Sequence, residues 1–115
     1  NKTDNTKQSL KVVSTSGYNS TYKLTNTDQF KVKLIAKGGQ TWIQVKNSDG
    51  SSQFQGLLKD GDSKTFDLTT QNEAVFVIGN TMNTKMYVNN KKLSYTISPS
   101  SEVRQNVTIQ FKPSK

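Results

Sequence analysis

The chain has 115 residues, with 16 Lys and Arg against 8 Asp and Glu and a net charge of +8. It contains no cysteine and no histidine, which excludes disulfides, thiolate or imidazole catalysis and the usual zinc ligands. No apolar run reaches the roughly 18 residues that a membrane span needs, and no signal peptide is recognisable. We therefore expect one domain, excised from a longer protein.

The first nine residues, NKTDNTKQS, carry no apolar side chain and are expected to form a flexible polar linker. A single β-domain is expected over residues 10–112, followed by a tail at residues 113–115. Asn, Gln, Ser and Thr dominate this domain, and such residues suit solvated strand faces and turns better than helix interiors. Many of the apolar residues alternate with polar ones, a period that predicts strands with one buried face.

Two alternating runs open the domain. Tyr22 and Leu24 predict a first strand with one solvated face. The pattern strengthens from Phe30, because Phe30, Val32 and Leu34 would share one face of a strand, with lysines on the other. Each run therefore predicts a half-buried strand.

Residues 41–58 predict a hairpin, because Asn47 to Gly50 supply side chains that tolerate the positive φ angles of a tight turn. Ile43 and Val45 would face the core together. A second turn over residues 59–62 leads to another alternating run, so two successive hairpins would form a meander.

Every position from Ala74 to Ile78 is apolar, which predicts a central strand covered on both faces. Further runs lie at residues 86–88, 93–97 and 107–111, and they predict the last strands. No stretch shows the apolar spacing of a helix. We predict an all-β domain: a single small β-sandwich or partly open barrel of about seven to nine mostly antiparallel strands, with essentially no helix.

The densest acidic group consists of Asp60, Asp62 and Asp67. A calcium-binding loop would need more oxygen ligands from a longer acidic run, and lysines stand beside this group. We expect the carboxylates to cap backbone N–H groups in turns. The sequence therefore predicts no metal site, no cofactor, no small-molecule substrate and no catalytic residue.

The lysines are scattered along the chain, which is typical of solvated strand faces that keep sheet edges from pairing. Their charge also favours loose attraction to polyanions. Arginine forks and aromatic platforms, which are common in nucleic-acid-binding domains, do not occur in the sequence. Nucleic acid is accordingly the least favoured partner.

Trp42 departs from the alternation, because it would point away from the apolar face of its own strand. Two interpretations remain open. The indole either covers a second small cluster with Leu57, Val75 or Val77, or it forms a surface for carbohydrate stacking or partner docking.

A second candidate contact surface consists of Tyr87, Lys91, Lys92 and Tyr95, which surround a predicted strand-turn-strand segment. Tyrosine beside lysine is also common on ordinary sheet surfaces. The role considered for these residues is contact with a partner or ligand.

From Phe30 onward, the order of these signals resembles the C-terminal extracytoplasmic domain of RodZ-type bacterial cell-shape proteins. The resemblance covers most of the chain, residues 30–112. The elements that carry it are, in order, Trp42-Ile43-Gln44-Val45, Asp49-Gly50, Phe54, Gly56-Leu57-Leu58-Lys59, Gly61, Ile78-Gly79-Asn80, Val88-Asn89 and Lys91. The preceding stretch, through Leu24, looks like an additional strand.

The resemblance implies a noncatalytic domain on the outer side of a bacterial plasma membrane. Its parent would carry a cytoplasmic helix-turn-helix domain that engages the bacterial actin homologue, a membrane-spanning helix absent from this chain, and a polar linker. We expect contact with cell-wall elongation proteins or anionic wall polymers, in support of rod shape and peptidoglycan elongation. The alternatives are a carbohydrate-binding or adhesin-like module and, third, a nonspecific nucleic-acid-binding domain.

Overall fold

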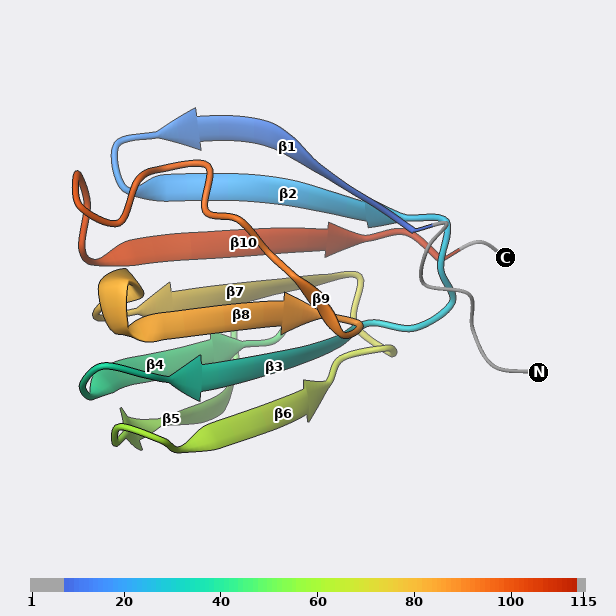
Figure 1. Ribbon diagram of the computed structural model, residues 1–115. Helices are drawn as coiled ribbons and strands as arrows, with labels where there is room; N and C mark the ends of the chain where they lie inside the picture. Colours follow the sequence, from blue (N-terminus) through green and yellow to red (C-terminus); the bar gives the residue numbers. More distant parts are fainter. Residues whose placement is uncertain (1–7, 114–115) are drawn as a thin grey trace.

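The computed structural model describes residues 8–113 and consists of two β-sheets packed face to face (Figure 1). The larger sheet has the strand order β1-β2-β10-β7-β4-β5, and the smaller has the order β6-β3-β8-β9. The elements are β1 (Ser9–Ser16), β2 (Asn19–Thr25), β3 (Lys31–Ala36), β4 (Thr41–Lys46), β5 (Ser52–Leu58), β6 (Ser63–Asp67), β7 (Glu73–Ile78), the 3₁₀ turn η2 (Thr81–Asn83), β8 (Thr84–Val88), β9 (Lys91–Lys92) and β10 (Gln105–Phe111). The predicted all-β sandwich is confirmed. Over residues 8–113 its strands number ten, more than expected, partly because the two-residue β9 is too short to give a periodic signal.

An apolar core fills the space between the sheets. Val32 and Leu34 of β3 are fully buried, as are Ile43 and Val45 of β4, so the alternation assigned these faces correctly. Burying one such side chain contributes roughly 1.5–3 kcal/mol. The core is therefore the main source of stability.

The chain changes sheet after β5, so the expected meander is wrong. β4 and β5 form the predicted hairpin, but β6 pairs with β3 of the smaller sheet. The reason lies in the apolar faces of β5 and β6. The rings of Phe54 and Phe66 pack on each other with 5.6 Å between their centroids, which places the two strands in opposite sheets.

β7 lies between β10 and β4, in the interior of the larger sheet, as its unbroken apolar run predicts. Phe76 is fully buried in the core. Val77 points to the other face, outside the core cluster, and is still only 6% exposed. Val75, on that same outer face, is half-buried. The central strand is therefore covered on its outer face as well.

The alternation over residues 93–97 does not form a strand, contrary to the prediction. Only β9 pairs with β8, and the chain then crosses from the smaller sheet toward the larger one (Figure 1). The hydroxyl group of Tyr22 in β2 holds this crossing segment. It donates to the Ser94 carbonyl (3.2 Å) and accepts the Thr96 N–H (2.9 Å). We call residues 93–98 the strap.

β2 is the parallel neighbour of β10, although the two strands come from opposite ends of the described chain. On its other side, β2 forms an antiparallel hairpin with β1, which a bulge between Val12 and Ser14 interrupts. The first hairpin is thereby attached to the last strand of the domain.

The folded domain already includes Gln8 and Ser9, which the sequence assigns to the linker. Ser9 pairs with Thr25, and the Gln8 side chain donates to the Val88 carbonyl (3.2 Å). The rest of the predicted linker, residues 1–7, and the last two residues of the predicted tail lie outside the described residues. Between residues 8 and 113, no helix has the length and apolar character needed to cross a membrane.

Candidate functional site

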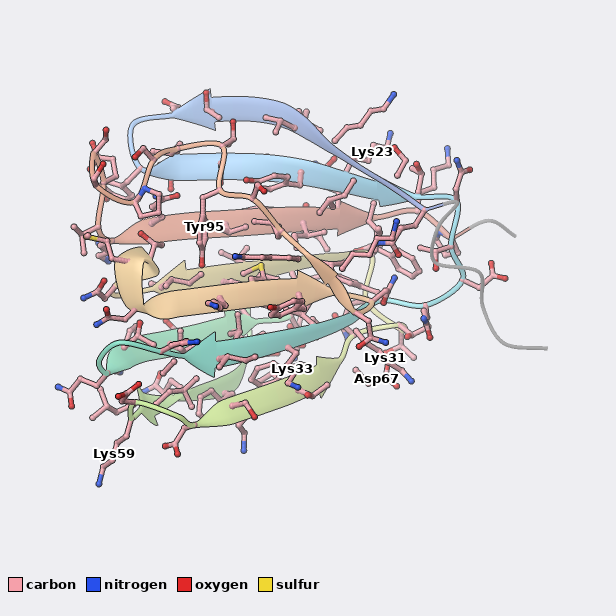
Figure 2. All side chains as sticks on the ribbon, viewed as in Figure 1. Lys23, Lys31, Lys33, Lys59, Asp67 and Tyr95 are labelled. Carbon is pink, nitrogen blue, oxygen red and sulfur yellow. The ribbon has the colours of Figure 1, made fainter. Side chains whose placement is uncertain are left out.

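Lysines gather on the outer face of the smaller sheet. Lys31 and Lys33 alternate along β3 with buried side chains, Lys85 does so in β8, and Lys92 comes from β9. The register places Tyr87 of β8 between Lys33 and Lys92, and Figure 2 shows the β3 lysines on the open side of the sheet. We call these five residues the lysine face.

Asp67 borders the lysine face opposite Lys31, and Figure 2 shows both at the same end of the sheet. Its Oδ1 atom accepts hydrogen bonds from the Thr69 hydroxyl (2.7 Å) and the Thr69 N–H (3.1 Å). These bonds and, to a lesser degree, the charge of Lys31 lower the pKa of the carboxyl group. The Asp67 carboxylate therefore stabilises the turn that leads to Thr69. It offsets the positive charge of the lysine face at the border beside Lys31.

A hollow of about 240 Å³ lies in the lysine face. Lys31, Lys33 and Tyr87 line it together with Thr65 and Asn90. Ammonium, hydroxyl and amide groups of this kind donate hydrogen bonds to anionic oxygens. The arrangement is therefore suited to holding phosphate or carboxylate groups.

The structure divides the four residues of the second predicted surface. Tyr87 and Lys92 are register partners within the lysine face. Lys91 follows the Asn89-Asn90 turn and lies outside the lysine face, but it lines a second hollow, between β9 and β1, together with Lys92. Sequence reasoning did not assign Lys31, Lys33 or Lys85 to this surface. The available signal was their alternation with buried residues on strands that turn out to be neighbours.

Tyr95 lies on the strap and turns toward the sandwich. Its hydroxyl donates to the Thr84 carbonyl (2.8 Å), and burial raises the pKa of the phenol. Thr84 is the first residue of β8, where β9 no longer pairs with that strand. Tyr95 therefore supplies the hydrogen-bond donor for the Thr84 carbonyl at the edge of the smaller sheet, where no described strand provides one.

Trp42 lies on the outer face of the larger sheet. It is 40% exposed, and its register partner Leu57 is 47% exposed. The Gly79 N–H donates to the Trp42 carbonyl (2.7 Å), and a Cβ atom at Gly79 would come within 3.2 Å of that oxygen. Trp42 thus has Leu57 beside it, as one interpretation expects, and an open surface, as the other requires.

The acidic residues of the second turn bind backbone groups, as expected. Asp60 Oδ1 accepts the Gly38 N–H (2.9 Å), and Asp62 Oδ2 accepts the Lys59 N–H (3.1 Å). Over the part of the chain that the structure describes, no three acidic residues come close enough together to hold a metal ion.

Comparison of the sequence with known proteins identifies the family of the chain. The model of the RodZ C-terminal domain matches residues 33–108. The chain belongs to the RodZ C-terminal domain family. It is also 30% identical, over 106 residues and 92% of its length, to a Bacillus subtilis (strain 168) protein described as "Uncharacterized membrane protein YmfM". The chain spans 36% of that relative's length. No solved structure matches it.

In this RodZ C-terminal domain, the family match begins inside β3 and ends inside β10. It therefore includes Lys33, Lys85, Tyr87 and Lys92, while Lys31 precedes it. The β1–β2 hairpin also lies outside the match. The alignment with the Bacillus subtilis protein, which covers 92% of the chain, extends over this hairpin as well.

Proposed function

We propose that this domain is a noncatalytic interaction module on the outer side of a bacterial plasma membrane. Membership in the RodZ C-terminal domain family and similarity to a protein described as a membrane protein support this role. The whole protein would add a cytoplasmic helix-turn-helix domain and a membrane-spanning helix. Its outer partners would be cell-wall elongation proteins or anionic wall polymers, in support of rod shape and peptidoglycan elongation.

The lysine face is the observation that carries the polymer contact. Lys31 and Lys33, two residues apart on one strand, stand about 7 Å apart on the same face, and neighbouring strands lie about 4.8 Å apart. A flexible polyanion can therefore set successive negative groups against several ammonium groups at once. Each exposed pair contributes about 1 kcal/mol or less, so binding depends on several weak contacts and on low salt.

Titration of the isotope-labelled domain with purified glycerol-phosphate teichoic acid, followed by two-dimensional NMR, tests this contact. We expect shifts concentrated on the lysine face and an affinity that falls as salt rises. The double variant Lys33→Glu/Lys85→Glu reverses the charge at its centre and should weaken binding at least about tenfold.

The matched control is Lys23→Glu/Lys46→Glu. It changes the net charge equally, but both positions lie on the outer face of the larger sheet. This variant should retain most of the affinity. Equal losses of affinity in the two variants would mean that binding depends on the net charge of the domain and not on the lysine face. Absence of binding at low salt, together with inert outer segments of elongation proteins, would refute the proposed module.

A second candidate function, carbohydrate binding, is favoured by the exposed indole of Trp42 beside Leu57. Aromatic rings of this kind provide flat apolar contact area. Trp42 is the single tryptophan of the chain, so its fluorescence reports this surface directly. A change in emission with peptidoglycan fragments would support carbohydrate binding, whereas unchanged emission across a glycan panel would eliminate it.

A further inference from the structure

β1 forms one edge of the larger sheet, and no described strand pairs with its outer side (Figure 1). Val12 and Val13 of this strand are 48% and 54% exposed. The opposite edge, β5, differs because its Phe54 packs on Phe66 of the facing sheet. The smaller sheet has two strands fewer, and its last strand on the β1 side is the two-residue β9. An unpaired edge of this kind can accept an additional strand.

The hydrogen-bond phase of β2 shows which groups of β1 face the open edge. The Leu24 carbonyl accepts the Lys112 N–H on the β10 side (3.0 Å). In a strand paired on both sides, successive residues direct their N–H and C=O groups to alternate neighbours. The next residue, Lys23, therefore bonds to β1, where its register partner is Lys11.

Leu10 and Val12, on either side of Lys11, consequently direct their N–H and C=O groups to the open edge. The side chains of Leu10 and Val12 line a hollow of about 260 Å³. Tyr22 and Leu93 complete its apolar part. The free edge of β1 therefore offers hydrogen-bonding groups to a new strand, and the hollow beside it has room for the side chains of that strand.

Lys91 and Lys92 line the other side of this hollow, and both are exposed. Among the residues that the structure describes, no acidic side chain lines it. In an added strand, the residues opposite Leu10 and Val12 would project to the same side as those two side chains. They would enter the hollow and meet the two lysines, so carboxylate side chains fit these positions.

We propose that β1 binds an extended acidic segment of a partner protein, which adds to the larger sheet as a seventh strand. The main chain of the segment pairs with Leu10 and Val12, and its acidic side chains meet Lys91 and Lys92. This mode, β-strand addition, takes affinity from main-chain hydrogen bonds and specificity from alternate side chains. The inference rests on the proposed role as an interaction module, and its site shares one residue, Lys92, with the lysine face.

The bulge between Val12 and Ser14 limits the length of the segment. A bulge bends its strand and disrupts the regular ladder. Regular pairing with a partner therefore runs from Ser9 to Val12, a stretch suited to a short peptide. The same bulge opposes unlimited edge-to-edge association of the domain with itself.

The probe for the experiment is the synthetic peptide acetyl-Glu-Val-Glu-Val-Glu-Val-amide, added to the isotope-labelled domain. Amide hydrogen exchange is measured residue by residue. We expect the N–H groups of Leu10 and Val12 to gain protection on binding. The N–H of Lys11, already bonded within the hairpin, should show little change.

Two kinds of variant test the mode of binding. Val12→Pro removes an edge N–H without removing a donor of the β1–β2 ladder, and should weaken binding at least about tenfold. If that variant does not fold, Lys91→Glu/Lys92→Glu provides an independent test and should cause a similar loss. The matched control Lys33→Glu/Lys85→Glu, on the lysine face, should bind the peptide with at most a few-fold change.

Protection of Leu10 and Val12 together with loss in the Lys91/Lys92 variant would support the proposal. Protection at β5, or equal losses from the two double lysine variants, would overturn it. If the peptide leaves β1 unprotected while teichoic acid still shifts the lysine face, this inference fails and the proposed function stands. If neither probe binds and elongation-protein segments are inert as well, both fail.

Discussion

The outer faces of the two sheets differ in what occupies their middle. On the smaller sheet, the lysine face covers the centre. On the larger sheet, the corresponding positions are neutral: Gln44, Val77 and Asn106 follow one another across β4, β7 and β10, and Trp42 with Leu57 lies toward one end. Both faces come from the same alternation of buried and exposed residues.

This difference shows that the net charge of the chain does not describe how its lysines are distributed over the two outer faces. Lys11 and Lys23 of the larger sheet are direct register partners, but they stand on its outermost two strands. The polyanion contact proposed for the smaller sheet would involve lysines at the centre of that surface, where several contacts can form together. The outer face of the larger sheet also carries Lys46, at the end of β4, but its middle is uncharged, and we call this outer face the neutral face.

The largest expected effect is a loss of unfolding free energy, and it should distinguish the core from the outer face of the larger sheet. Phe76→Ala should lower the free energy of unfolding by about 3 kcal/mol or more, because it opens a cavity in the core. Val75→Ala, on the outer side of the same strand, should cost about 1 kcal/mol or less. Urea titrations measure both. Equal costs would mean that the neutral face is packed as tightly as the core.

A middle-sized effect compares the strap with the lysine face through two tyrosine hydroxyl groups. Tyr95→Phe should cost about 1 kcal/mol of unfolding free energy, since the Thr84 carbonyl loses its donor. Tyr87→Phe, on the lysine face, should change stability by less than about 0.5 kcal/mol. Thermal unfolding of both variants tests this difference, and a larger loss at Tyr87 would reverse it.

A smaller effect concerns pH at the border of the lysine face. The pKa of Asp67 is lower in the folded state, so its contribution to stability is present above the unfolded-state pKa and disappears as pH falls through the folded value. The carboxyl is almost fully exposed, which keeps this contribution small. Asp67→Asn should reduce stability near neutral pH and show a weaker acid dependence. An unchanged acid profile would contradict this account.

For the smallest effect, we expect no change in the fluorescence of Trp42 on the neutral face. Teichoic acid bound to the lysine face should leave the emission maximum of Trp42 where it is, because the two surfaces belong to opposite sheets. Iodide should quench Trp42 with and without the polymer. A polymer-dependent shift would place the contact on the larger sheet.

The sequence predicts most strands because an alternating run encodes which face is buried. It does not encode which sheet a strand joins, so the partner of β6 could not be derived. The sequence predicts a strand at the strap for a related reason: Leu93 and Tyr95 would alternate with exposed residues in any extended chain, whether or not it pairs with a neighbour. In the candidate site, the sequence groups Tyr87 and Lys92 in one predicted surface because they are close along the chain, whereas Lys33 joins them only through long-range register.

The parallel pairing of β2 with β10 also constrains the order of folding. β2 contributes Tyr22 and Leu24 to the core, but the neighbour that anchors it, β10, is the last strand of the described residues. Contacts between such distant segments close late, because forming them costs loop entropy before they add stability. During synthesis, the N-terminal hairpin must therefore remain undocked until almost the whole domain has left the ribosome. A chain truncated before Gln105 would leave this hairpin without the strand that holds it.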